Sequence, residues 1–140
     1  MTMALRVSTA VRTAAVDAVT ALADAGTGAG TIKVYTGTQP ATADTAPTGT
    51  LLVTFTLADP AYSAAVAGVA ELDTDPDIAA VAVASGTAGW ARLADSDGNA
   101  VYDDLCKTDG TSAFTLNTLV IANSQTITLT AGTFTVPSGA

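Results

Sequence analysis

The first part of the chain places apolar residues at helical spacing. Over residues 5–25 they recur every three or four positions, which is the period of one face of an α-helix. This helix stripe consists of Val7, Val11, Ala15, Val19 and Leu22. Glycines within residues 26–30 end the pattern, because glycine stops a helix readily and leaves a flexible hinge. The stripe would either cover the protein's own sheet or dock on a neighbouring subunit, with its valines and its leucine as the contact residues.

From residue 31 onwards the pattern changes to alternation. The segments "TIKVYTG" (31–37) and "TLLVTFTL" (50–57) alternate their side chains as half-buried strands do. Near the end of the chain, "QTITLT" and "GTFTVP" place Thr on one face and Ile, Leu, Phe and Val on the other. Turn signals separate these segments at short intervals, which is typical of an antiparallel sandwich or barrel. We therefore expect a mainly β fold, an antiparallel β-sandwich of jelly-roll type, preceded by one N-terminal α-helix.

Two further segments refine this expectation. The run "IAAVAVASG" at 78–86 is apolar on both faces and predicts a central strand. The pair Asp97-Gly98 predicts a hairpin, since both residue types tolerate positive φ. We divide the chain into a helix and hinge over residues 1–30 and a β-sandwich domain over residues 31–140.

A long polar connection joins the first two expected strands. This ribbon, residues 36–49, reads "TGTQPATADTAPTG" and is too long for a tight hairpin. Pro40 and Pro47 stiffen it, so ordering it costs little entropy. A loop of this kind lies over a sheet edge or reaches a neighbour. Gln39 and Pro40 are its candidate contact residues.

The chain is strongly acidic. Among its 140 residues are 13 acidic and 5 basic side chains, a formal net charge of −8. Binding nucleic acid through its phosphates needs clustered Lys and Arg, and so does holding an anionic membrane surface. No run approaches the roughly 18 apolar residues of a membrane helix. The composition thus argues against nucleic-acid and membrane partners, while an acidic surface favours solubility among crowded copies.

Several chemistries are disfavoured by residues that are missing. Histidine is absent and cysteine occurs once, which excludes an intramolecular disulfide and the common zinc sites. Without histidine the commonest general base is also lost. Acidic neighbours would raise the pKa of the Cys106 thiol, and we interpret this residue as a small buried apolar group. We expect no enzymatic activity, no cofactor and no metal.

One acidic motif resembles the start of a calcium loop. "DSDGN" spaces Asp95, Asp97 and Asn99 as an EF-hand does. The twelfth position, however, is Cys106 where an EF-hand has Glu, and the flanks read as strands. An ordinary hairpin is the favoured interpretation, and a weak calcium site completed by the carboxylates at 103–104 is the alternative.

The single tryptophan and the single glutamate also have plain interpretations. Trp90 is the largest apolar side chain, and we expect it to anchor the core or a subunit contact rather than to form a ligand platform. A glycosidase pair of carboxylates is disfavoured, because Glu71 is the only glutamate and aromatic residues are few. The carboxylates within residues 73–77 are interpreted as a solvated turn.

Short motifs along the chain carry a family resemblance. In order they are "IKVYTGTQPATADTAPTGTLLVTFTL", "GTAGWARLADSDGNAVYDDL" and "FTLNTLVIANSQTITLTAGTFTV". This arrangement resembles a group of small virion proteins of tailed bacteriophages, in which a similar ribbon, hairpin and closing strand pair recur. The resemblance covers most of residues 31–137, and "YTGTQP" with "GTAGWARLADSDG" is its most specific part.

The resemblance implies a structural role without catalysis. Its first implication is a capsid decoration or cement protein, which binds and stabilises the shell on the surface of the virion. Its partners would be the major capsid protein and further copies of itself, in a homo-oligomer such as a homotrimer. The alternative is a minor tail or fibre module that binds a host-surface glycan. A small hydrolase that uses Asp95 and Asp97 is a third hypothesis.

Overall fold

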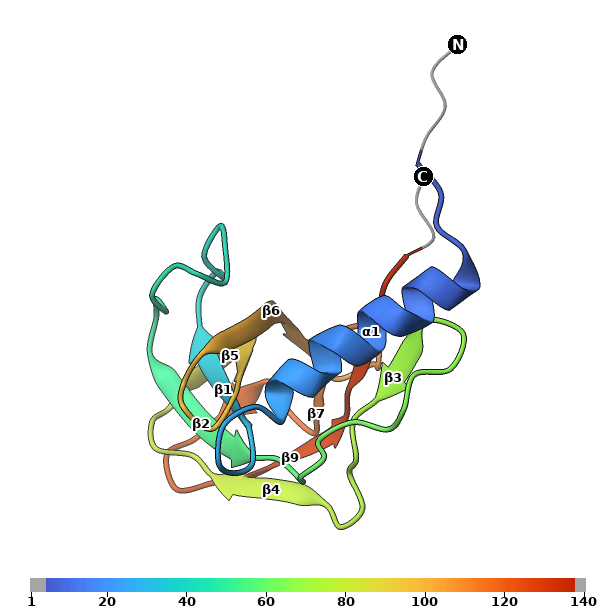
Figure 1. Ribbon diagram of the computed structural model, residues 1–140. Helices are drawn as coiled ribbons and strands as arrows, with labels where there is room; N and C mark the ends of the chain where they lie inside the picture. Colours follow the sequence, from blue (N-terminus) through green and yellow to red (C-terminus); the bar gives the residue numbers. More distant parts are fainter. Residues whose placement is uncertain (1–4, 138–140) are drawn as a thin grey trace.

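The computed structural model describes residues 5–137 and is mainly β, with one helix near the N-terminal end (Figure 1). The elements are α1 (Thr9–Ala23), β1 (Thr31–Thr36), β2 (Leu51–Thr56), β3 (Val69–Glu71), β4 (Ile78–Val81), β5 (Gly86–Ala94), β6 (Ala100–Lys107), β7 (Phe114–Leu116), β8 (Val120–Ile121), β9 (Thr126–Ala131) and β10 (Thr133–Thr135). The expected mainly β fold with an N-terminal helix is confirmed, and α1 lies within the predicted range 5–25.

The main sheet is mixed and nearly closed into a barrel. Its strands follow the order β2-β1-β5-β6-β7-β9-β4, and β8 pairs with β5 beside this path. β6 and β7 are parallel, while the other neighbours along the path are antiparallel. The two ends of the path meet where the N–H of Val83 donates to the C=O of Leu52 at 2.8 Å. The expected antiparallel sandwich is therefore wrong.

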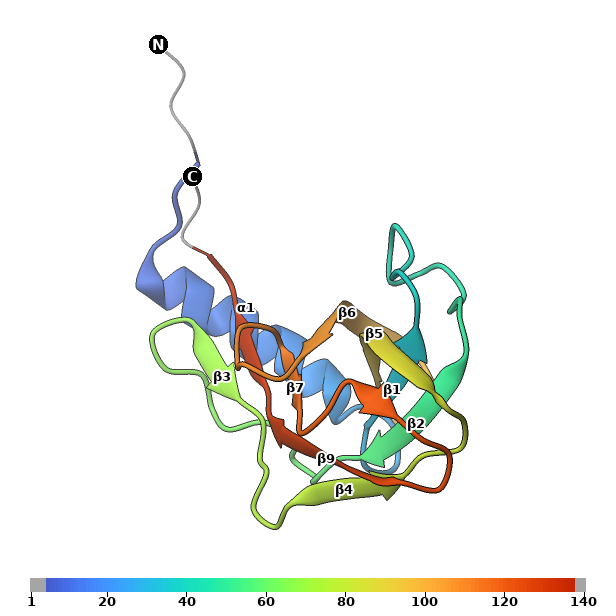
Figure 2. The ribbon, with the colours of Figure 1, turned by 180° about the vertical axis from the view of Figure 1, so that it is seen from behind.

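The physical reason for closure is the twist of the sheet. Each strand is rotated against its neighbour, and the rotation accumulates until the first and last strands come together. Residues 108–113 turn the chain back beside β6 in the same direction, which produces the parallel pair Cys106–Phe114. A second, two-stranded sheet of β3 and β10 lies beside the helix (Figure 2).

The strand predicted to be central lies at the end of the path instead. β4 forms strand pairs with β9 alone. Val81 on its outer side and Val83, just after the strand, are 58% and 64% exposed. Ile78 and Ala82, which point the other way, are buried in the core. The strand is apolar on both faces, but only its inner face is covered by the barrel.

The helix and the strands share one hydrophobic core. Val16 and Ala23 of α1 are fully buried in the cluster that also contains Ile32, Leu93 and Phe114. The glycine-rich segment after the helix is bonded as well, since Ser96 Oγ accepts from the N–H groups of residues 27 and 28 at 3.0 and 3.2 Å. The helix is thus packed into the same hydrophobic core as the strands.

Candidate docking surface

The helix turns a different face to the barrel from the one that the sequence pattern selects. Its buried residues are Val16, Thr20 and Ala23. These lie one position after Ala15, Val19 and Leu22 of the helix stripe, which corresponds to roughly 100° of rotation about the helix axis. Covering the protein's own sheet is therefore the wrong role for the stripe as a whole.

The stripe is left partly uncovered. Val11 and Leu22 are 53% and 55% exposed, and Val19 is half-buried. Val7 is also half-buried and precedes the helix, whose N-cap is Ser8. Part of each of these side chains remains free to contact a partner.

Polar contacts fix the rotation of the helix. Asp17 Oδ1 accepts from the N–H of Ala65 and Asp24 Oδ1 accepts from the N–H of Ala61, both at 2.8 Å. The hydroxyl of Thr13 accepts from the N–H of residue 68 at 3.0 Å. All three acceptors bind the loop between β2 and β3, so the helix cannot rotate to bury its stripe without losing them.

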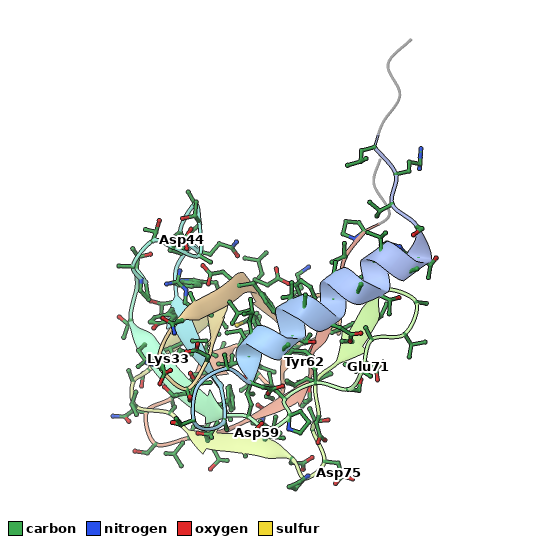
Figure 3. The ribbon with its side chains drawn as sticks, in the orientation of Figure 1. Lys33, Asp44, Asp59, Tyr62, Glu71 and Asp75 are labelled. Atoms are coloured by element: carbon green, nitrogen blue, oxygen red, sulfur yellow. The ribbon has the colours of Figure 1, made fainter. Side chains whose placement is uncertain are left out.

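The ribbon is an exposed loop that runs from the end of β1 to the start of β2. Its middle part, with Asp44, rises above the strands (Figure 3). Gln39 and Pro40, the candidate contact residues, are both half-buried. Gln39 Oε1 is buried without a hydrogen-bond partner. These residues therefore face the protein itself as well as solvent.

Trp90 lies on the outer side of the barrel sheet, yet it is fully buried. Its neighbours Ala91 and Leu93 belong to the main core, whereas Trp90 does not, because successive side chains of a strand point to opposite faces. Its ring stacks on Tyr35, with ring centroids 4.7 Å apart and an interplanar angle of 18°. The guanidinium of Arg92 lies 5.5 Å from its ring centroid. Trp90 therefore anchors a separate cluster, outside the main core, and its side chain is fully shielded from solvent.

Arg92 closes this Trp90 cluster through an ion pair. Its Nε and Nη2 donate to the two carboxylate oxygens of Asp103 at 2.7 and 2.8 Å, a bidentate geometry. The hydrogen bonds with Asp103 raise the pKa of Arg92, and the carboxylate of Asp44 adds to this effect. A ribbon residue is therefore close enough to the cluster to act on it electrostatically.

The most specific motifs of the sequence meet at this cluster. "YTGTQP" contributes Tyr35 and the start of the ribbon, and "GTAGWARLADSDG" contributes Trp90 and Arg92. A Cβ added at Gly89 would collide with the carbonyl oxygen of Gly37, so glycine is needed where the two motifs touch. The motifs therefore describe one structural unit, formed by β1, β5 and the ribbon.

The hairpin between β5 and β6 forms as predicted. Asp95 Oδ1 accepts from the N–H groups of Asp97 and Asn99, and Gly98 has φ 88°. The side-chain and backbone hydrogen bonds from Asn99 lower the pKa of Asp95. Asp103, proposed as a further calcium ligand, instead forms the bidentate ion pair with Arg92. Within residues 5–137, no group of three or more Asp, Glu, Cys or His side chains is arranged to hold a metal.

A hollow of about 450 Å³ lies beside the end of β10. Tyr102 and Phe134 form its apolar part, and Asp104 is among its polar lining residues. Both oxygens of Asp104 already accept from backbone N–H groups, those of Leu105 and Ala113, at 2.8 Å. Its size suits a small ligand, but this carboxylate is committed to the protein's own loop.

A second hollow of about 440 Å³ lies near Tyr62, Glu71 and Asp75, whose positions are labelled in Figure 3. Tyr62 and Tyr102 share a hydrogen bond between their hydroxyls at 2.7 Å. Burial raises the pKa of Tyr62 to about 12 and also raises that of Tyr102. Both phenols are therefore neutral at physiological pH and act as structural groups.

Cys106 is buried, as the sequence predicted. Burial raises the pKa of its thiol to about 12, with a smaller contribution from Asp104. The thiolate, which is the reactive form, is therefore scarce at neutral pH. None of the described helices is long and apolar enough to cross a membrane.

Comparison with known proteins adds no assignment. No protein-family model, no curated protein and no solved structure matches the chain significantly. The candidate docking surface is defined by the geometry described above. It consists of the exposed part of the helix stripe and the exposed ribbon, whereas Trp90 is buried in this structure.

Proposed function

We propose that this chain is a non-enzymatic structural protein of a tailed-bacteriophage virion, and most specifically a capsid decoration or cement protein. The observation that carries the proposal is the uncovered helix stripe. Val11 and Leu22 remain more than half exposed on a helix whose opposite side is fixed to the barrel. A rigidly held apolar row of this kind suits docking on a protein surface.

The remaining surface is compatible with display in many copies. The net charge of −8 keeps crowded copies soluble and apart. Alternate positions of β9, including Thr126 and Thr130, carry exposed threonine residues. Docking of many such subunits on a closed shell would stabilise the shell through mass action.

The alternative, a tail or fibre module that binds a glycan, has one observation in its favour. The hollow beside Tyr102 and Phe134 combines aromatic rings with polar groups, as saccharide sites do. Tyr102, however, already stacks on Phe114 with ring centroids 5.4 Å apart and packs against Phe134 at 4.8 Å. Little aromatic face is left for a sugar, and we therefore rank this function second.

Copy number and position in purified particles distinguish the two functions. We expect quantitative gels to give a copy number comparable to that of the shell subunits. We expect cryo-EM density for the barrel on the outer face of the capsid, with α1 turned towards the shell. A few copies confined to the tail would favour the glycan-binding module, and absence from particles would refute both.

A further inference from the structure

The ribbon is attached to the barrel only at its ends. Within it, Thr45 N–H donates to the C=O of Thr42 at 3.2 Å, and Thr48 donates to the C=O of Thr38 at 3.5 Å. The hydroxyls of Thr42 and Thr45 also share a bond at 3.0 Å. Among the hydrogen bonds of residues 5–137, none joins residues 38–49 to any other part of the protein. The ribbon can therefore move without breaking a hydrogen bond to the barrel.

The side of the sheet next to the ribbon is not part of the main core. The outer side of β1 and β5 carries Tyr35, Trp90 and Arg92, and the barrel interior lies on the opposite side. Tyr35 covers one face of the Trp90 ring, and Gln39 and Pro40 are half-buried close by in sequence. Trp90 is 0% exposed although it lies outside the main core. Gly37 lies against Gly89, next to Trp90, and Asp44 acts electrostatically on Arg92, so the ribbon lies beside this cluster.

The closed arrangement leaves polar atoms unsatisfied. Trp90 Nε1 and Gln39 Oε1 are both buried and without a hydrogen-bond partner. An unpaired buried donor or acceptor costs free energy, and it recovers its hydrogen bonds when water reaches it. The gain from burying the indole ring is therefore offset in part, which narrows the free-energy difference between a closed and an open ribbon.

The ends of the ribbon have the conformations of hinges. Gly37 and Gly49 have φ of 83° and 87°, in the region that glycine adopts without strain. Each lies next to the threonine pair that joins the ribbon to the strands, Thr36 and Thr50, whose backbones bond at 3.0 Å. The segment between the two glycines is thus free to swing as a unit.

We propose that the ribbon is a lid with a second, open position, in which it swings about Gly37 and Gly49 and uncovers Trp90, Tyr35 and Arg92. This opening is a property of the isolated chain, and it stands or falls independently of the virion function proposed above.

Trp90 is the only tryptophan, so its signals report the lid directly. The test measures hydrogen exchange of the indole N–H by NMR in the unmodified protein. We expect exchange through a local opening, so that its rate does not change at low denaturant concentrations. Amides of residues 38–49 should exchange alongside it. The most protected core amides exchange only when the whole protein unfolds, so their exchange rate rises with denaturant. If the exchange rate of the indole N–H rises with denaturant in the same way, the lid does not open and the proposal is wrong.

A variant of Gly89 provides a second test of the lid. In Gly89→Ala the new methyl group collides with the carbonyl oxygen of Gly37 and displaces the base of the ribbon. We expect a red-shifted Trp90 emission and several-fold stronger acrylamide quenching, with a cooperative thermal transition retained. Gly28→Ala is the matched control, because its nearest contact, Ser96 Cβ, lies at an ordinary 3.9 Å. An unchanged Trp90 spectrum in folded Gly89→Ala would also overturn the proposal, and the exchange measurement decides the matter if this variant does not fold.

Discussion

Replacing the two exposed residues of the helix stripe with glutamine should separate docking from folding. In the double variant Val11→Gln/Leu22→Gln both side chains are already more than half exposed, at 53% and 55%. Full burial of such a side chain is worth about 1.5–3 kcal/mol, so the part buried within the monomer contributes about 1 kcal/mol each. Glutamine keeps an apolar stem and is a better helix former than valine. We therefore expect the free energy of unfolding to fall by no more than about 2 kcal/mol.

The effect on docking should be larger than the effect on folding. If a partner covers the exposed half of each side chain, the lost burial amounts to about 1–1.5 kcal/mol per residue. Both substitutions together remove about 2–3 kcal/mol, which corresponds to a dissociation constant raised by roughly 30- to 150-fold. The assay is co-sedimentation of purified protein with particles that lack it, over a concentration series. Circular dichroism with thermal unfolding establishes that the variant is folded.

Val120→Gln provides the matched control, because Val120 is 73% exposed on β8, away from the helix. We expect it to bind particles as the unmodified protein does. Docking through the stripe would be refuted by a folded double variant that binds as tightly as the control. Equal weakening of both variants would likewise assign the effect to general surface hydrophobicity rather than to the stripe.

Three further outcomes follow from named contacts. Ser8→Ala removes the hydroxyl that accepts from the N–H of Val11 at 3.2 Å, and we expect about 1 kcal/mol lower stability in thermal unfolding. Because burial raises the pKa of Tyr62 to about 12, its contribution to stability is complete below the unfolded value near 10.0 and is lost as the pH rises towards 12. Unfolding midpoints measured across that range should fall, and a midpoint that stays constant between pH 10 and 12 would contradict this. Cys106 should resist aromatic disulfide reagents at pH 8 until the protein is denatured, whereas rapid labelling of folded protein would show that the thiol is accessible.

Local patterns in the sequence predicted the elements well, because these depend on nearby residues. The helix, the strands β1 and β2 and the hairpin at Asp97-Gly98 all form where periodicity and turn residues indicated. The closed barrel could not be predicted in the same way. It depends on the parallel pairing of β6 with β7 and on the meeting of Val83 with Leu52, and neither leaves a periodic signal in the chain.

The position of Trp90 shows how one irregularity changes a candidate site. By simple alternation Ala88 and Trp90 would share a face of β5. The register of β1 with β5 shifts between Tyr35 and Thr36, opposite this stretch, and Ala88 enters the core while Trp90 points outward. An extra residue in a strand exchanges its faces, which the hydrophobic pattern alone does not reveal. The sequence therefore identified Trp90 as an anchor but not the side of the sheet that it anchors.

The rotation of the helix follows from a similar competition between apolar area and polar bonds. Rotating α1 to bury the exposed half of Leu22 would gain about 1–1.5 kcal/mol. The same rotation would withdraw Asp17, Asp24 and Thr13 from the backbone N–H groups of the β2–β3 loop. Hydrogen bonds contribute about 1 kcal/mol each, so the three together are worth about 3 kcal/mol. The polar anchors outweigh the leucine, and they hold the larger apolar residues of the helix at the surface. An apolar row kept exposed by bonds on the other side of its helix is available to a partner without any rearrangement of the barrel.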